Sequence, residues 1–473
     1  MVLLIISLDA EISGLSCLTE FACVLTVEIY FSLFSGIFDM SVEIFINFTV
    51  DPIRNYVGWA PSRCAIRSAD GAAKTVRLAN QNPAQGGQLV FLAAADAQPA
   101  SDLQIDVPAE GISEFYIAGS FDQNTGQGFP STEDGDAAIE AFDTSNNASI
   151  HTERLMVRVR KNANDLTLDE RDRFLTAIVT LNQNGDFVDF QNMHVNDTSM
   201  EVHGRSCFLP WHRFYLLDLE RKLQRIDPSV SLPYWRFDQP SPNIFTADFM
   251  GVPDATGLVQ FSSTNPLVNW RLTVFGEGSG RIRRSPLFDT ANDPANIEND
   301  EVDTFALGTT GTGPDQRTNF ENFERLESDP HGTAHVSFQG QIAEIGRAPA
   351  DPLFFMLHCN VDRLWAKWQW LRGLYDSNNV SAYYKQGSGP INSDTMRLGA
   401  DRIGNYSRDT LWPWNGRQGD PRPRTAPGTY FPDSFIAAPD RYPDIQGAMD
   451  FQGQLDLSRN LGFAYDDVPY DHV

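Results

Sequence analysis

The stretch DPLFFMLHCNVDRLWAKWQ, from Asp351 to Gln369, carries the strongest helix signal in the chain. Asp351 is a good N-cap residue, and Pro352 suits the first turn of a helix, where its missing N–H is not needed. Beyond them, apolar residues recur at helical spacing and share one face with a histidine: Phe354, His358, Val361, Trp365 and Trp368. We therefore predict a long core helix that carries a buried histidine.

Two further helices are predicted before it. TLDERDRFLTAIVTLNQ begins with Thr167 and Glu170 at the spacing of a capping box, and apolar residues then recur at helical spacing. A second helix is expected to begin near Trp211, directly after Pro210. Its apolar face again includes a histidine: His212, Leu216, Leu219 and Leu223.

Six of the eight histidines fall into two clusters of three. The first cluster is His194, His203 and His212, and the second is His331, His335 and His358. Asp329 as a cap and Pro330 in a first turn would place His331 and His335 on one helix face. Three imidazoles per metal, without thiolates or clustered carboxylates, suit copper or zinc. Two such sites facing each other in a helix bundle would form a dinuclear centre.

Two segments that contain these histidines resemble a known family. HGRSCFLPWHRFYLLDLER (203–221) and DPLFFMLHCNVDRLWAKWQ closely resemble the two copper signatures of the type 3 copper proteins, specifically the tyrosinase and catechol oxidase (polyphenol oxidase) family. The resemblance covers roughly residues 151–473. It implies that each histidine cluster binds one copper ion in a four-helix bundle. It also implies that the protein oxidises o-diphenols to o-quinones with dioxygen, with monophenol hydroxylation weaker or absent.

Five further residues are candidates for the site. Asp362, one turn after His358, could fix an imidazole tautomer, or could instead form a salt bridge on the helix surface with Arg363 or Lys367. Phe354 is expected to pack against the copper histidines. By resemblance, Glu327 matches an acid that orients a water in plant polyphenol oxidases, and Ile345 matches a gate at the substrate entrance. Gly332 stands where efficient tyrosinases often have Asn, and this favours diphenol oxidation.

The resemblance also has departures and leaves alternatives open. Some family members link a cysteine to the second histidine of the first site, but the matching position here is Thr198, and Cys207 lies on the other side of His203. We therefore expect a free His203. Other possible functions are a full tyrosinase, an o-aminophenol oxidase, an oxygen carrier like haemocyanin, and a zinc-binding structural protein.

The remaining sequence suggests a multidomain α+β protein. Short apolar runs between Gly, Asp, Asn and Pro predict a β-sandwich-like domain over residues 40–150: KTVRLAN, GQLVFLAAA, EFYIAGSF and AAIEAF. A mainly α-helical type 3 copper domain over 151–473 follows, with a four-helix bundle core. Its last part, from about residue 376 to 473, is rich in Gly, Pro, Asn and Asp and is expected to wrap the core irregularly.

Composition limits the choice of partners and location. The net charge of −26 over 473 residues disfavours nucleic acid and anionic membranes, which require basic surfaces. Residues 1–39 contain no Lys, Arg, His or Pro, and acidic residues interrupt their apolar runs. They match neither a signal peptide nor a membrane span. We expect this leader to lie outside the fold, with a natural start at Met40, and expect a cytoplasmic protein because no CxxC motif or disulfide pattern occurs.

Overall fold

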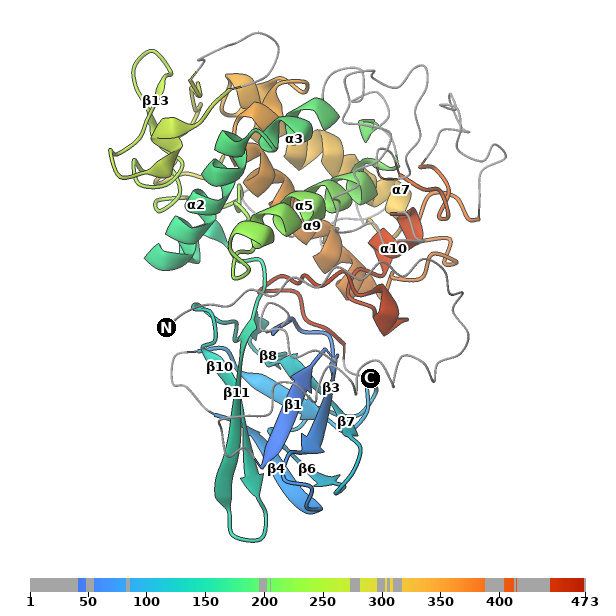
Figure 1. Cartoon of the computed structure of the whole chain (residues 1–473). Helices are drawn as coiled ribbons and strands as arrows, with labels where there is room; N and C mark the ends of the chain where they lie inside the picture. The colour runs from blue at the N-terminus through green and yellow to red at the C-terminus, as the bar shows by residue number, and fades with distance from the viewer. Residues whose placement is uncertain are drawn as a thin grey trace, which may run out of the picture.

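The computed structural model describes residues 41–47, 55–81, 86–194, 202–204, 206–272, 281–295, 303, 307–308, 317–387, 404–411, 414 and 443–471. The predicted leader and the start expected at Met40 lie outside these ranges. Within them, the protein has a β-rich part and a helical part, one above the other, and a stretch near the C-terminus passes between them (Figure 1). No helix among the described residues is long and apolar enough to span a membrane.

The β-rich part contains a four-stranded sheet in the order β1-β3-β7-β5 and a five-stranded sheet in the order β2-β11-β10-β4-β6. Side chains alternate between the core and the surface along a strand, so Val76 and Leu78 of β4 are fully buried while their neighbours are partly exposed. One cluster of buried apolar side chains draws on both sheets. The strands are β1 Val42–Ile46, β2 Tyr56–Val57, β3 Ser62–Ser68, β4 Lys74–Asn80, β5 Leu89–Leu92, β6 Asp102–Val107, β7 Ser113–Gly119, β8 Phe121–Asp122, β9 Gln127–Gly128, β10 Ala137–Asp143 and β11 Ala148–Val157.

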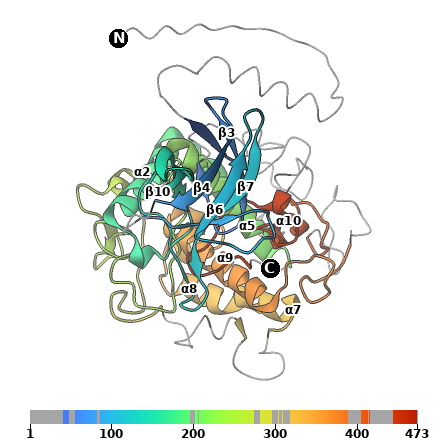
Figure 2. The same cartoon turned by 90° about the horizontal axis from the view of Figure 1, so that it is seen from below.

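The helical part is built around α5 and α9, which pack against each other and carry apolar and buried polar residues on most of their faces. A helix that is buried nearly all round needs neighbours on every side, and α2, α10 and the irregular segments provide them. Viewed from below, the strands lie in front of this part (Figure 2). The helices are α2 Leu168–Asn184, α3 Phe187–Met193, α5 Phe208–Ile226, α7 Phe320–Phe323, α8 Thr333–Val336, α9 Leu353–Arg372 and α10 Ile445–Met449, and a short hairpin is formed by β12 Val252–Pro253 and β13 Val259–Gln260.

The two parts are joined along a seam formed by the chain after β11 and by a segment near the C-terminus. Trp59 Nε1 donates to the Tyr465 carbonyl at 2.7 Å, and the Arg160 N–H donates to the Ala464 carbonyl at 2.8 Å. Along the same segment Tyr465 belongs to the helical core, whereas Ala464 belongs to the core of the two sheets. This segment therefore contributes to both cores at once.

Several element boundaries can be compared with the sequence predictions. The capping box of Thr167 and Glu170 opens α2 as predicted. The predicted domain boundary at residue 150 is wrong, because β11 continues to Val157 and includes His151. Helix α5 begins at Phe208, before Pro210, which its first turn accommodates.

The predicted caps near two histidines also need adjustment. Pro352, predicted in the first turn, occupies the N-cap position of α9, and Asp351 lies one residue earlier, where its Oδ1 accepts from the Leu353 N–H at 2.9 Å. Asp329 is not an ordinary cap: its backbone is extended, with φ −144° and ψ 122°, inside an irregular turn over Ser328–Gly332 that leads into α8. The described residues after 376 are irregular apart from α10 and a short 3₁₀ turn over Leu457–Arg459.

Candidate metal centre

The six clustered histidines come together in the fold as two triads. In each triad the three candidate ligand nitrogens lie within 4.8 Å of one another: His194, His203 and His212 in the first, and His331, His335 and His358 in the second. The triads adjoin, because the rings of His212 and His358 lie face to face with centroids 4.3 Å apart and an interplanar angle of 12°. The structure thus assembles the two metal sites that the histidine spacing predicted.

Backbone carbonyls fix four of the rings. The Nδ1 of His212 on α5 lies 2.7 Å from the Phe208 carbonyl, one turn earlier on the same helix. The other three contacts join His194 to Ile345 at 2.9 Å, His331 to Glu327 at 2.7 Å and His335 to Ile342 at 2.6 Å. A carbonyl only accepts hydrogen bonds, so each Nδ1 carries the proton and each Nε2 presents a lone pair.

The Nε2 atoms of both triads converge as metal binding requires. The Nε2 of His358 lies 3.3 Å from that of His331 and 3.1 Å from that of His335, and the Nε2 atoms of His194 and His212 are 3.3 Å apart. Between His194 and His212, whose Nδ1 atoms both hold the proton, the two bare Nε2 lone pairs repel each other unless a cation lies between them. The donor set of each triad therefore fits a copper ion held by three neutral imidazoles.

Burial keeps these imidazoles neutral. Removal from water lowers the pKa of His194, His212, His331 and His358 well below the usual value, and the proximity of other histidines lowers it further. Burial likewise lowers the pKa of His335 to about 4. At neutral pH the rings therefore do not need to lose a proton before they bind metal.

One side of the centre is open. His203 and His335 are only partly buried, whereas the other four histidines are at most 6% exposed. Gly204, next to His203, is exposed, and Val336, next to His335, is 53% exposed. We infer that a substrate reaches the centre from the side of His203 and His335.

Comparison with known proteins identifies the family. The family described as "Common central domain of tyrosinase" matches residues 184–371, which include all six histidines. A tyrosinase of Streptomyces glaucescens is 34% identical over 231 residues, which cover 45% of this chain and 82% of the relative. The chain belongs to the tyrosinase family. This is a dinuclear copper family, so the protein is a copper-dependent oxidoreductase that acts on phenols with dioxygen.

Other relatives extend this result. A tyrosinase of Streptomyces antibioticus is 30% identical over 277 residues, covering 54% of this chain and 93% of the relative. Hemocyanin 2 of Megathura crenulata is 26% identical over 227 residues, covering 45% of this chain and 6% of the relative. The similarity therefore includes proteins named as tyrosinases and a protein named as a hemocyanin.

Aromatic rings enclose the dicopper centre of this tyrosinase-family protein. The ring of Phe354 lies 4.1 Å from that of His358 and 4.9 Å from that of His194, so Phe354 packs where the sequence placed it. Phe208, which the sequence did not single out, lies 4.5 Å from His212 and 4.9 Å from His331. These two rings form an apolar wall that contacts both triads.

Three other predicted residues lie at the open side or next to it. Glu327 provides the carbonyl that holds His331, and its Oε1 accepts from the Gly204 N–H at 2.6 Å. Gly332 follows His331 in a helical conformation. Ile345 is 53% exposed, so it is not an ordinary core residue. Its backbone carbonyl holds His194. The gate role of its side chain stays a prediction.

Asp362 lies in a different place from the one expected. Its Oδ1 accepts from Arg213 Nε at 2.6 Å, and its Oδ2 accepts from Arg160 Nη1 at 3.1 Å and from the Tyr465 hydroxyl at 2.6 Å. Neither Arg363 nor Lys367 is its partner; both bind Asp467 instead. No hydrogen bond from Asp362 to an imidazole occurs among the described residues, and the buried Nδ1 of His358 has no partner there. The expected tautomer-fixing contact is therefore corrected to a buried ion-pair network.

The sequence did not reveal which groups orient the ligands. Backbone carbonyls do most of this work, and any residue type supplies a carbonyl, so no sequence signal marks them. Arg213 could have been noticed as a charged residue directly after His212 in the otherwise apolar first half of its helix, FLPWHRFYLL. Thr198, on which the expectation of a free His203 rests, lies outside the described residues.

Proposed function

We propose that the protein oxidises o-diphenols to o-quinones and hydroxylates monophenols only weakly. The copper pair, when bound, supplies the redox chemistry with dioxygen. Over a full cycle two diphenols lose four electrons and four protons, and one dioxygen becomes two waters. The residues of the chain bind the phenol, exclude water and hold protons.

Gly332 is the observation that carries the preference for diphenols. A phenol is a weak acid with a pKa of ~10, so hydroxylation of a monophenol benefits from a base or a positioned water that removes its proton. Gly332 directly follows the ligand His331 and has no side chain to position such a water. Glu327 is the nearby acid, but its Oε1 already accepts from the Gly204 backbone. A catechol does not need the hydroxylation step and should lose less.

The position can accept a side chain, which makes the idea testable. The backbone of Gly332 is helical, with φ −59° and ψ −39°, and among the described residues a Cβ there would meet only the Glu327 carbonyl oxygen, at 3.5 Å. That distance is an ordinary contact. Gly332→Asn adds an amide near Glu327, and Gly332→Ala adds a methyl group without hydrogen-bonding ability, which makes Ala the matched control.

The experiment compares kcat/KM for tyrosine and for catechol in copper-loaded protein. We expect wild type to favour catechol, and we expect Gly332→Asn to raise the tyrosine-to-catechol ratio by about tenfold, a modest share of the ~10²–10⁴ typical of acid–base catalysis. Gly332→Ala should leave the ratio near that of wild type. Equal turnover of both substrates by wild type, or an unchanged ratio in the Asn variant, would contradict the proposal and favour a full tyrosinase. Replacing catechol by o-aminophenol tests the remaining enzyme alternative.

An oxygen carrier is the alternative from another class. A carrier shields its copper pair from substrates, and a separate part of the chain such as the β-rich part is a candidate for that shield. Among the described residues, the aromatic rings that contact the six histidines all belong to the helical part, for example Phe208, Trp211, Tyr215 and Phe354. Arg158, directly after β11 of the β-rich part, instead donates to the Pro228 carbonyl, just beyond the last turn of α5. This placement favours an enzyme, and steady turnover of catechol would exclude a pure carrier.

A further inference from the structure

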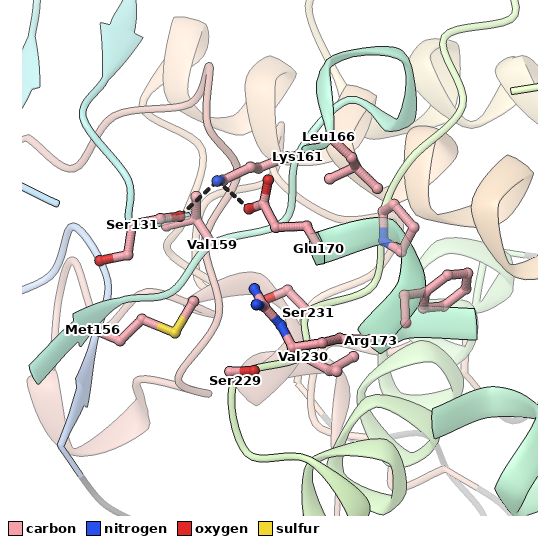
Figure 3. A pocket seen from close by; sticks show the side chains of 12 residues that line it. Ser131, Met156, Val159, Lys161, Leu166, Glu170, Arg173, Ser229, Val230 and Ser231 are labelled. Atoms are coloured by element: carbon pink, nitrogen blue, oxygen red, sulfur yellow. Dashed lines mark hydrogen bonds and ion pairs between the residues drawn. The ribbon is translucent and has the colours of Figure 1, made fainter. Parts of the chain in front are cut away.

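A cavity of about 480 Å³ lies at the seam, away from the histidines. Residues of β2, β3 and β7 form one side, including Tyr56, Ser62 and Tyr116, and the segment near the C-terminus forms the other with Leu457 and Asn460. Its volume falls in the range of small-molecule sites. Another hollow on the seam (Figure 3) measures about 30 Å³, and its Lys161 already binds Glu170 and the Ser131 carbonyl. Only the larger cavity has room for an organic ligand.

The charge of this cavity is opposite to that of the protein. The chain has 62 acidic and 36 basic residues, yet no Asp or Glu lines the cavity, whereas Arg63 and Arg158 do. Arg63 lies in the exposed part and forms a bidentate pair with Glu114. The nearby carboxylate of Asp134 accepts from the Tyr56 hydroxyl at 3.1 Å. The positive charge in the lining that is not already paired is therefore that of Arg158.

Arg158 is the residue that lacks a counter-ion. Its Nη1 donates to the Pro228 carbonyl, and its guanidinium lies 4.3 Å from the centre of the Tyr56 ring. No carboxylate lies within 4.0 Å of it among the described residues, and its Nε and Nη2 have no acceptor there. By contrast, the four arginines that are at most 1% exposed, Arg160, Arg213, Arg284 and Arg363, each bind a carboxylate.

The surroundings of Arg158 increase its need for an anion. Burial and the positive charge of Arg221 lower the pKa of Arg158 to about 10. Glu220, the closest source of negative charge on α5, is held by Arg160 at 2.9 Å. A guanidinium with free N–H groups binds a carboxylate in a bidentate geometry, and such charge-assisted hydrogen bonds are stronger than neutral ones.

The other residues that line the cavity indicate the chemical nature of the rest of the ligand. The rings of Tyr56 and Tyr116, together with Pro61 and Leu457, provide apolar surface for a flat ring, and Ser62, Ser458 and Asn460 can bond ring substituents. We propose that this cavity binds a small aromatic carboxylate, whose carboxylate pairs with Arg158 and whose ring packs between the tyrosines and Leu457. The bound ligand contacts the strands and the segment near the C-terminus and so holds that segment against the sheets, where Leu457 already packs.

Benzoate is the simplest probe, and the readouts are calorimetric binding and melting temperature of the copper-loaded full chain. A ligand that binds only the folded state raises the melting temperature in proportion to its occupancy. We expect Arg158→Gln to weaken benzoate binding at this site by roughly tenfold or more, since it removes a charge-assisted pair. Ser62→Phe fills the cavity and keeps Arg158, so it should abolish binding at this site even if the Arg158 variant is poorly folded.

Two controls separate this site from the dicopper centre. Arg408→Gln removes the same charge from an exposed arginine and should bind benzoate like wild type. Inhibition of catechol oxidation by benzoate, which reports binding at the copper pair, should persist in Ser62→Phe. The proposal is overturned if benzoate does not stabilise wild type, or if both cavity variants bind and respond like wild type. Neither outcome depends on whether the proposed diphenol preference is correct.

Discussion

The two histidine triads offer the same three imidazole donors to a metal but are held in different ways. The second triad is anchored locally, since His331 bonds a carbonyl four residues away and His335 one seven residues away. In the first triad only His212 is held by a nearby carbonyl, that of Phe208, and two other contacts come from residues of the second triad's segment. The carbonyl that holds His194 belongs to Ile345, 151 residues later, and the Gly204 N–H beside His203 is held by Glu327, 123 residues later.

This difference implies that the first site depends on the second more than the second depends on the first. The segment from Glu327 to Ile345 carries two ligands of the second triad and also two anchors of the first. Damage to that segment should therefore disturb the first copper as well as the second. Damage to the segments of the first triad should leave the second copper in place.

Loss of a ligand should have the largest effect on activity. His358→Ala removes one of three donors and the ring that stacks on His212 of the other triad, so we expect catechol oxidation to fall by at least about a hundredfold, since even weaker changes around a metal cost ~10–100-fold. His151→Ala is the matched control, because His151 lies on β11 beside Glu153 and outside both triads. Steady-state oxidation of catechol measures both. Substantial activity in His358→Ala would break the assignment of the second triad.

Asp362 should matter mainly for stability. It is buried between Arg160 and Arg213 on the helix that carries His358, and removing one partner of a buried pair typically costs about 3–5 kcal/mol. We expect Asp362→Asn to lower the free energy of unfolding by about that amount in denaturant titrations while both coppers stay bound. Asp172→Asn, at an exposed pair with Arg171, should change it by less than about 1 kcal/mol. Unchanged stability together with loss of the second copper would restore the tautomer-fixing role.

Glu327→Ala tests the dependence of the first triad on the second segment. The side chain of Glu327 holds Gly204 beside His203, whereas only its backbone carbonyl holds His331, and alanine keeps that carbonyl. We expect the affinity of the first copper to fall by ~10–100-fold and the second to change little. Stepwise removal by a chelator, followed by copper analysis, measures this. Glu321→Ala, at an exposed acid of α7, is the control, and equal loss of both coppers from Glu327→Ala would contradict the asymmetry.

Local signals explain which parts of the structure could be predicted. The capping box at Thr167 and the alternating residues of β4 are patterns within a few residues, and both elements form as predicted. The histidine triads could also be predicted, because metal binding requires three donors and the chain has few histidines elsewhere. The end of the β-rich part was misplaced, because the helical pattern was extended back to His151, which lies inside β11.

Long-range contacts explain what the sequence could not reveal. Asp362 was assigned to its neighbours on the helix, but its partners Arg160 and Arg213 lie 202 and 149 residues away. Such a pairing depends on which helices pack together. The spacing of residues along one helix does not contain that information. The anchors of His194 and Gly204 were missed for the same reason.

Copper content tests the central claim most directly. Copper-reconstituted wild-type protein, freed of loosely bound metal by dialysis and analysed for copper and protein, should contain close to two coppers per chain, as two three-histidine sites require. His212→Ala and His358→Ala should each fall toward one. A wild-type ratio near one, or two coppers retained in both variants, would contradict the assignment of the six histidines to a dicopper centre.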